Sequence, residues 1–222
     1  MPRRLNLPDT ASIATQGEAG KPFAPSAARN ADAIGQMIAE IAPTRGNALE
    51  LASGTGQHVV KLAAACPGLT WHPTEIAPER RASIDAYVAD SGLTNIAPAA
   101  TLDATTPGWS DTHHGHALVF LSNLLHLIST AEARTLIQNA AGALAPAGVL
   151  AIYGPFMRDD ELTSEGDRAF HDSLQAQDPE IGYKSDFDVV EWGQQAGLTF
   201  DAMIEMPANN LVIVYRLANL DF

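Results

Sequence analysis

The sequence predicts an α/β protein built on a doubly wound, mostly parallel β-sheet. Between residues 47 and 153, short apolar stretches alternate with segments of helical periodicity, which is typical of strand–helix–strand units. The run from His116 to Leu121 is apolar almost throughout, as in a strand that is buried on both faces. The stretch Ala48–His58 reads as the end of a buried strand, a tight turn of small residues and the start of a helix.

The expected elements follow one another in a regular order. A first helix, led by Arg29 and Asn30, ends before Pro43, because a proline disfavours helix in the residue that precedes it. The next elements are a strand at 47–51, a helix at 55–65, a strand at 69–74, a helix at 78–90 and a weaker strand at 95–102. A buried strand at 116–121 precedes a helix from Ser129 to about Leu144, which a capping box begins, and then a strand at 149–153.

The pattern changes after Phe156. Helices are expected at 164–177 and 186–196, followed by strands at 200–205 and 211–215 that pair as a C-terminal antiparallel hairpin. Residues 1–24 are rich in Pro, Gly, Ala, Ser and Thr, so we expect a flexible arm, or else an arm that closes over the site. Residues 25–222 are expected to form one domain, with a lid-like insertion at about 157–183.

Composition limits the possible functions. The 222 residues carry 26 acids against 13 Lys and Arg, a net charge of −13, and such a field repels nucleic-acid phosphates. No stretch approaches the roughly 20 apolar residues of a membrane span. Cys66 is the only cysteine, which excludes internal disulfides and multi-cysteine metal sites. We expect a cytoplasmic protein that acts on a small molecule, without nucleic acid or membrane as partner.

The turn after the first strand has the features of a nucleotide-type ligand site. Gly54 and Gly56 lack a Cβ, so a ligand can approach the backbone closely, and the following helix points its free N–H groups into the same crevice. Glu50, at the strand's end, would repel a pyrophosphate but suits a cationic amino group. S-adenosylmethionine carries both an ammonium and a sulfonium group. The stretch Glu50–Gly56 thus resembles the first motif of class I methyltransferases, with Ala52 where a glycine is usual.

Two further acids follow the next two expected strands. Glu75 can accept hydrogen bonds from both ribose hydroxyls of an adenosine ligand, a placement that suits NAD equally well. However, Val59 stands where the dinucleotide fingerprint has its third glycine. In class I methyltransferases, an acid placed like Asp103 accepts from the adenine amino group; an Asp that caps a turn is the alternative. Three acids after three successive strands favour S-adenosylmethionine as cofactor.

The polar stretch Ser122–His126 leaves the fourth expected strand where the donor methyl group would sit. His126 is a candidate base or acceptor-orienting group, with packing or helix capping as the alternative. Asn123 can bond cofactor or substrate. An Asn/Asp-Pro-Pro-Tyr motif is missing here, which disfavours methylation of an amide or of the exocyclic amine of a base. The histidines at 113, 114 and 116 have no acids around them, so no metal site is expected.

Several specific stretches resemble an uncharacterised methyltransferase-like family, over nearly the whole length from residue 25. They are 25–30, 51–58, 71–75, 123–129, 153–156, 177–179 and 206–211. The resemblance implies a seven-stranded class I methyltransferase fold, which is Rossmann-like, with S-adenosylmethionine as ligand. It supplies no acceptor.

The candidate site residues follow from these motifs and the resemblance. The cofactor candidates are Arg29, Glu50, Ala52, Ser53, Gly54, Gly56, Glu75, Asp103, Ala104, Ser122 and Asn123. The catalytic candidates are His126, Asn123 and Tyr153. An acceptor pocket is hypothesised from Arg29, Asn30, Asn123, His126, Tyr153, Phe156, Asn209 and Asn210; the alternative is that the last three and Tyr153 hold turns together. Lys184 is a further candidate to meet an anionic group.

The function that the sequence favours is methyl transfer from S-adenosylmethionine to oxygen, nitrogen or sulfur of a small molecule, with S-adenosylhomocysteine as product. Arg29 is available to neutralise an anionic acceptor or the cofactor carboxylate. Two alternatives remain, a non-catalytic S-adenosylmethionine-binding module and an NAD-type oxidoreductase.

Overall fold

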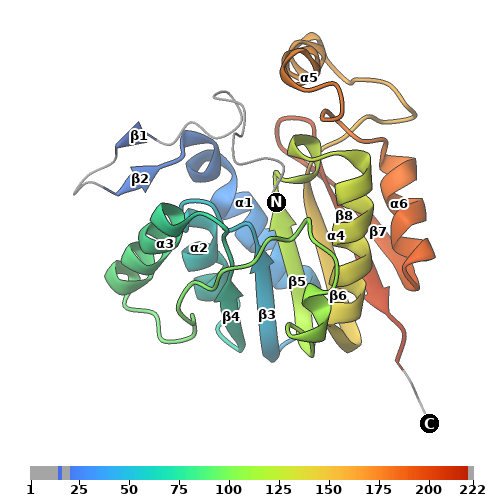
Figure 1. The fold of residues 1–222 in the computed structure, drawn as a ribbon. Coiled ribbons are helices and arrows are strands. Elements are labelled where there is room, and N and C mark those ends of the chain that lie inside the picture. Colours follow the sequence, from blue (N-terminus) through green and yellow to red (C-terminus); the bar gives the residue numbers. More distant parts are fainter. Residues whose placement is uncertain (1–14, 17–20, 220–222) are drawn as a thin grey trace.

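The chain folds around one six-stranded sheet. The computed structural model describes residues 15–16 and 21–219, and Figure 1 shows their arrangement. The strand order is β4-β3-β5-β6-β8-β7. The strands are β3 (Gly46–Leu51), β4 (Leu69–Pro73), β5 (His116–Ser122), β6 (Leu144–Pro155), β7 (Leu198–Met206) and β8 (Asn210–Leu217). Two further strands, β1 (Thr15–Gln16) and β2 (Pro22–Phe23), form a small separate ladder.

The helices connect the strands as the alternating pattern predicts. They are α1 (Pro25–Ile41), α2 (Gln57–Ala65), α3 (Pro78–Ser91), α4 (Thr130–Ala143), α5 (Glu165–Gln177) and α6 (Asp186–Gln195). Two 3₁₀ turns, η2 (Trp109–Asp111) and η3 (Leu125–Leu127), flank β5. The pairs β4–β3, β3–β5 and β5–β6 are parallel, whereas β8 pairs antiparallel with both β6 and β7. The mostly parallel sheet and the C-terminal antiparallel hairpin are therefore confirmed.

The prediction of a seventh strand, at 95–102, is wrong. This segment runs beside the outer edge of β4 but makes only two isolated parallel bridges, Trp71 with Ile96 and Thr74 with Ala100. Between the two bridges lies Pro98, which has no N–H to donate to a ladder. The segment therefore accompanies the sheet as an interrupted edge, and the sheet has six strands.

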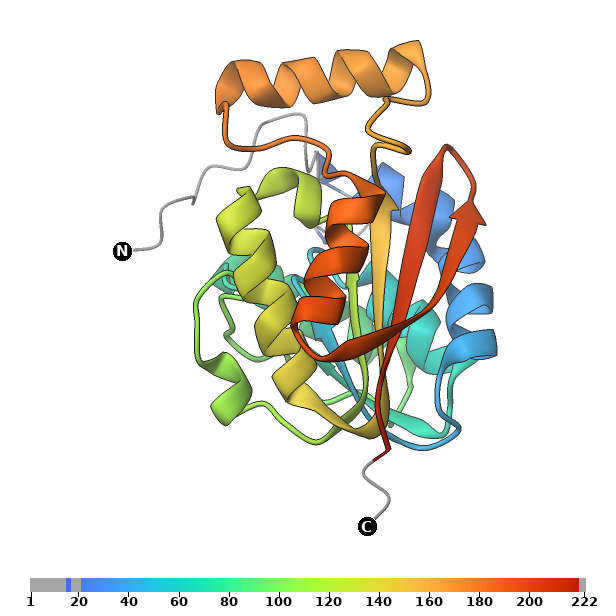
Figure 2. The ribbon, with the colours of Figure 1, turned by 90° about the vertical axis from the view of Figure 1, so that its right-hand side faces the viewer.

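Helices cover both faces of the sheet, which confirms the doubly wound arrangement (Figures 1 and 2). Leu118, Phe120 and Ala151 face α1 and α2, in one core cluster with Ile34 and Leu62. The alternate strand residues face α4 and α6 in the other cluster, which contains Val119, Leu121, Ile152, Leu136 and Trp192. Full burial of each large apolar side chain contributes roughly 1.5–3 kcal/mol. The central strands are buried on both sides because helices cover each face of the sheet.

Helix α1 begins four residues earlier than the sequence predicts. Pro25 occupies its first turn, where the missing proline N–H costs nothing. The backbone N–H of Ala24 donates to Gln57 Oε1 at 2.7 Å, which ties the start of α1 to the start of α2. Most of the expected flexible arm, 1–24, lies outside the described residues.

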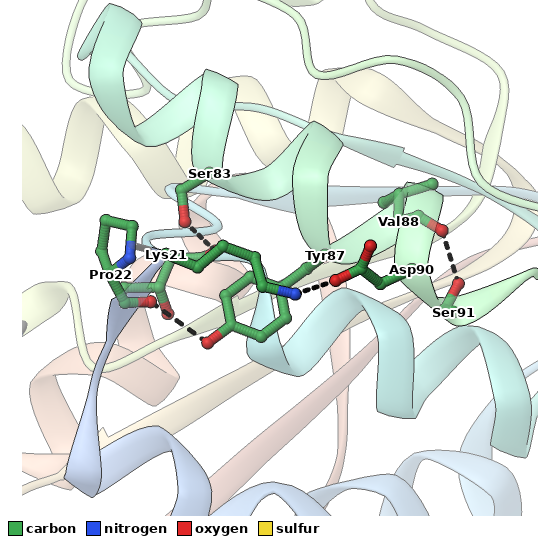
Figure 3. Close-up of polar contacts among 8 residues, drawn as sticks. Lys21, Pro22, Ser83, Tyr87, Val88, Asp90 and Ser91 are labelled. Atoms are coloured by element: carbon green, nitrogen blue, oxygen red, sulfur yellow. Dashed lines mark hydrogen bonds and ion pairs between the residues drawn. The ribbon is translucent and has the colours of Figure 1, made fainter. Parts of the chain in front are cut away.

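The described part of this arm contacts α3. Lys21 pairs with Asp90 and places its Nζ 4.8 Å from the centre of the Tyr87 ring (Figure 3). The Tyr87 hydroxyl donates to the carbonyl of Pro22 at 3.2 Å. Residues 21–24 are thus attached to α3 and lead directly into α1.

The segment that was expected as an insertion holds α5, which lies beyond the carboxyl ends of the strands and apart from the helices on the faces (Figure 2). Its N-cap is Ser164, whose hydroxyl accepts from the N–H of Asp167. Leu174 packs with Ile181 and with Leu127 of η3 in a small cluster of its own. Across the described residues, none of the helices has the length and apolar character needed to cross a membrane.

Candidate functional site

A cavity of about 200 Å³ opens at the carboxyl ends of β3, β4 and β5. The residues that follow each of these strands line it, together with the start of α1 and the 102–105 segment. Its lining comprises Ala24, Ser26, Ala27, Ala52, Ser53, Gly54, Thr55, His58, Glu75, Ile76, Arg80, Leu102, Asp103, Ala104, Thr105, Ser122, Asn123, Leu124, Leu127, Ile128 and Glu132. This is the edge at which open α/β sheets bind ligands.

The turn between β3 and α2 is shaped by left-handed backbone. Ala52 has a φ of 52° and Gly54 a φ of 60°, and the N–H of Gly54 donates to Glu75 Oε2 at 3.1 Å. Gly56 also has a positive φ, but it does not line the cavity. A Cβ on Gly56 would lie 2.7 Å from the Cα of Ile84, so this glycine is needed for the close approach of α2 and α3.

Glu75 is a fixed carboxylate at the end of β4. Its Oε1 accepts from the N–H groups of Ile76 and Ala77 at 2.8 and 3.3 Å, and its Oε2 accepts from Gly54. The side chain is 6% exposed, and its exposed part lines the cavity. A carboxylate accepts up to about four hydrogen bonds, so Glu75 keeps capacity for a ligand with hydroxyl donors.

Glu50 is buried without full hydrogen bonding. It is 1% exposed, and its Oε2 has no hydrogen-bond partner. Burial raises the pKa of Glu50 to about 8; a hydrogen bond from Ser53 opposes this rise and the nearby charge of Glu75 adds to it. Glu50 does not line the cavity itself, but Ala52 and Ser53 beside it do. A cationic group held there would satisfy this carboxyl and lower its pKa.

Asp103 and Ala104 both line the cavity. Asp103 Oδ1 accepts from the N–H and the hydroxyl of Thr105 at 3.0 and 2.6 Å, so this residue also holds its own turn. The turn-capping alternative and the ligand-facing placement are therefore compatible.

A chain of hydrogen bonds leads from the cavity to the core side of α1. Ser122 Oγ lies 3.3 Å from His58 Nδ1, and His58 Nε2 lies 2.8 Å from Asn30 Oδ1. Asn30 Nδ2 donates to the Tyr153 hydroxyl at 3.3 Å. Burial lowers the pKa of His58 to about 4, so its imidazole is neutral at pH 7. The sequence reasoning missed His58, although its place in the first turn of α2, which points to the strand ends, is a signal for it.

The other catalytic candidates lie outside the cavity. His126 is 4% exposed and packs edge-on against the rings of Phe170 and Tyr183. Burial lowers the pKa of His126 to about 3, and the charge of Lys184 adds to this effect. Tyr153 is buried at the far end of the hydrogen-bond chain. Of the three candidates, only Asn123 lines the cavity.

Most of the hypothesised acceptor pocket is not brought together. Arg29 is exposed on α1 and Phe156 is buried in the core that faces α4 and α6. Asn209 donates to Asp167 Oδ2 and Asn210 donates to the Pro207 carbonyl, so these two residues stabilise the hairpin turn and its contact with α5. The buried Lys184 donates to the carbonyls of Ile128 and Gly182.

Across residues 15–16 and 21–219, no three His, Cys, Asp or Glu side chains are grouped so that they could hold a metal ion.

A family model that matches most of the chain identifies its family. The family model described as "Protein of unknown function (DUF938)" matches residues 21–217. The chain belongs to this family. The recognition of an uncharacterised family from the sequence is thereby confirmed.

Solved methyltransferase structures share the fold of this DUF938 protein. An O-methyltransferase family protein from Burkholderia thailandensis matches with a TM-score of 0.75 and 18% identity, over 88% of this chain and 57% of its own. Human N-acetylserotonin methyltransferase in complex with SAM matches with a TM-score of 0.73 and 15% identity, over 87% and 53%. An O-methyltransferase family 2 protein from Planctomyces limnophilus, in complex with apigenin, matches with a TM-score of 0.73 and 19% identity, over 86% of this chain and 59% of its own.

At these low identities, the TM-scores show a shared fold and no more. The class I methyltransferase fold is thus confirmed for the DUF938 chain. The chain spans little more than half the length of the structures that it matches.

Proposed function

We propose that this DUF938 protein is an S-adenosylmethionine-dependent methyltransferase that acts on a small molecule. The observation that carries the proposal is the carboxyl of Glu50, buried beside the cavity with one oxygen unpartnered. An isolated buried carboxyl is costly unless a partner arrives, and a cation is the partner that suits it best. The ammonium group of S-adenosylmethionine is such a cation.

The remaining lining supports the same cofactor. Glu75 is fixed by three backbone N–H groups, and its remaining acceptor capacity would take a ribose hydroxyl. Asp103 and Ala104 would meet the adenine ring, while Ala52, Ser53, Gly54, Ser122 and Asn123 would hold the amino-acid part. When bound, the cofactor supplies an electrophilic methyl group. We leave Arg29 and Gly56 out of the cofactor site, because neither lines the cavity.

The acids make a dinucleotide a poorer fit. The charge of Glu75 reaches the nearby Glu50 and would repel a pyrophosphate, and the buried carboxyl of Glu50 offers a phosphate no cation. The structural neighbours support a methyltransferase, and one of them is described with apigenin, which favours a small-molecule acceptor. Leu124, Leu127 and Ile128 give the cavity an apolar wall for the body of such an acceptor.

We further propose that 157–183 is a lid over this edge of one domain, and that the segment before α1 closes the cavity from the other side. Ala24 and Ser26 line the cavity, and α5 lies above the strand ends (Figure 2). A cytoplasmic location suits a chain whose one cysteine, Cys66, is buried and free.

Calorimetric titration with S-adenosylmethionine and S-adenosylhomocysteine tests the cofactor. Wild type should bind both ligands, and Glu75→Gln should weaken binding by roughly 5- to 150-fold, the cost of unpairing buried hydrogen bonds. Glu79→Gln is the matched control, because Glu79 is exposed on the neighbouring turn of α3. No heat with either ligand, from folded protein, would overturn the proposal, and binding of NAD would then favour the oxidoreductase.

Turnover separates an enzyme from a binding module. Formation of S-adenosylhomocysteine from the methyl donor and a mixture of metabolites indicates catalysis. Tight binding of S-adenosylmethionine without any such product, across a broad mixture, would favour the non-catalytic module.

A further inference from the structure

The hydrogen-bond chain behind the cavity has a fixed direction. Asn30 Nδ2 is used by the Tyr153 hydroxyl, so Asn30 presents its Oδ1 to His58 Nε2 at 2.8 Å. An amide oxygen only accepts, and His58 Nε2 must therefore carry the hydrogen. In a neutral imidazole the other nitrogen is then a pure acceptor. His58 Nδ1 consequently receives the hydrogen of the Ser122 hydroxyl.

This direction decides what Ser122 offers to a ligand. Its one hydrogen is donated to His58, and its oxygen lone pairs remain for a ligand in the cavity that it lines. Ser122 therefore accepts from a ligand that carries a hydrogen-bond donor. His58 lines the same cavity and is 8% exposed, so solvent has little access to its ring.

We propose that Ser122 and His58, held in this tautomer by Asn30, receive the proton of a hydroxyl group on the methyl acceptor. The inference rests on the proposed methyl-transfer function and adds to it the proton route and the acceptor atom. His126, which the sequence favours as a base, lies outside the cavity and takes no part.

The proton and electron balance closes with these groups. The acceptor oxygen forms a bond to the methyl carbon, and the carbon–sulfur bond breaks with its electron pair remaining on sulfur. The acceptor proton passes to Ser122 Oγ while the hydrogen of Ser122 passes to His58 Nδ1. The imidazolium returns its proton through Ser122 to water when the product leaves.

The basicity of His58 suits a hydroxyl acceptor. Burial lowers its pKa to about 4, so the imidazole stays neutral and able to accept at physiological pH. An oxygen that has gained a methyl group and still holds its proton is a very strong acid, which even this weak base deprotonates. A methylated ammonium, with a pKa of about 10, would keep its proton against it.

Asn30 acts as a positioning residue in this scheme. It is neutral, so it fixes the ring and the tautomer without raising the basicity of His58 as a carboxylate would. Tyr153 holds Asn30 in its orientation, and burial raises the pKa of this phenol, so it remains protonated.

Proton acceptance by His58 can be measured without any acceptor molecule. Ser122→Cys places a thiol at the cavity end of the chain, and the only natural thiol, Cys66, is buried. Alkylation by iodoacetamide at pH 7 reports the thiolate fraction. We expect Ser122→Cys to react at least about tenfold faster than Ser122→Cys/His58→Gln, because the charge of a thiolate raises the proton affinity of the adjacent imidazole, whereas glutamine keeps a hydrogen bond but cannot hold the proton. Equal rates would overturn the proposal.

Nuclear magnetic resonance of wild type, labelled with ¹⁵N in its histidines, provides a second test, which reads the tautomer directly. The His58 signals are assigned by their loss in His58→Gln. We expect a neutral ring with Nε2 protonated at pH 6, and loss of this tautomer preference in Asn30→Ala. A hydrogen on Nδ1, or an imidazolium at pH 6, would sink the assignment.

The proposed function and the proton route can be refuted separately. If wild type does not bind S-adenosylmethionine in calorimetry, the proposed function is lost, whereas the thiol rates and the tautomer still stand on their own. If it binds, and His58→Gln binds equally well within about threefold but methylates a hydroxyl acceptor at least about tenfold more slowly, the pair acts on the acceptor, as proposed. An acceptor methylated on an amine would overturn the choice of hydroxyl.

Discussion

Glu50 gives the sharpest prediction, because its buried carboxyl should lower the stability of the fold while favouring the binding of a cationic ligand. Its folded-state pKa of about 8 lies above the ordinary value of 4.5. For an acid with a raised pKa, the stabilising contribution is fully present below the unfolded pKa and is lost as the pH rises toward the folded one. Glu50 should therefore destabilise the fold progressively between pH 4.5 and 8.

The magnitude follows from the same two values. Each pH unit in this window costs about 1.4 kcal/mol, so that at pH 7.5 the loss reaches at most about 4 kcal/mol. Glu50→Gln has nearly the same shape and does not titrate. We expect the variant to gain stability relative to wild type as the pH rises, and the gain to level off above pH 8.

Urea unfolding of both proteins at pH 5, 6, 7 and 8 measures this difference. All other titrating groups are common to the two chains, so the difference between the two curves of free energy against pH isolates Glu50. Glu40→Gln, an exposed change, is the control and should follow wild type throughout. Parallel curves for Glu50→Gln and wild type would refute the reasoning.

Two further predictions concern the packing around the site. Gly56→Ala should cost about 2–4 kcal/mol of unfolding free energy, because the new Cβ would meet Ile84 Cα at 2.7 Å in a left-handed backbone. Gly92→Ala is the control: it also has a positive φ, of +66°, but open space around the new Cβ, and should cost only about 1–2 kcal/mol. Similar losses for the two variants in urea unfolding would contradict this prediction. Ser129→Ala removes the hydroxyl that accepts from the N–H of Glu132 at the start of α4 and should cost about 1 kcal/mol by thermal or urea unfolding; an unchanged midpoint would show that the cap is dispensable.

The elements that the sequence predicted correctly are those specified by local patterns. Strands buried on both faces need continuous apolar runs, and the run at 116–121 is one of them. The capping box at Ser129 is confirmed, since its hydroxyl accepts from Glu132 N–H and Glu132 accepts from Ser129 N–H. The strand expected at 95–102 failed because one proline interrupts a ladder that the apolar pattern alone would support.

The site was predicted only as far as it depends on the strand ends. Residues after parallel strands must meet at one edge, so Glu75, Asp103 and Ser122 were predictable from the order of the elements. The partners of His58 were not, because Asn30 and Ser122 lie 28 and 64 residues away in the chain. His126 lies within the η3 turn, and there it packs against Phe170 of α5 rather than facing the cavity.

Some of the local costs that this fold tolerates lie at the edge of the sheet that forms the cavity. Ala52 and Asn123 are non-glycine residues in left-handed backbone, and both line the cavity. Glu50 and His58 lie in or beside it, and burial shifts both toward their neutral forms. Such local penalties persist where the surrounding structure enforces them, and they concentrate at functional sites. If Glu50→Gln proves more stable and yet loses affinity for S-adenosylmethionine, the stability that the carboxyl of Glu50 costs is explained by its role in binding the ligand. A carboxyl with a purely structural role would not lower the stability of the fold.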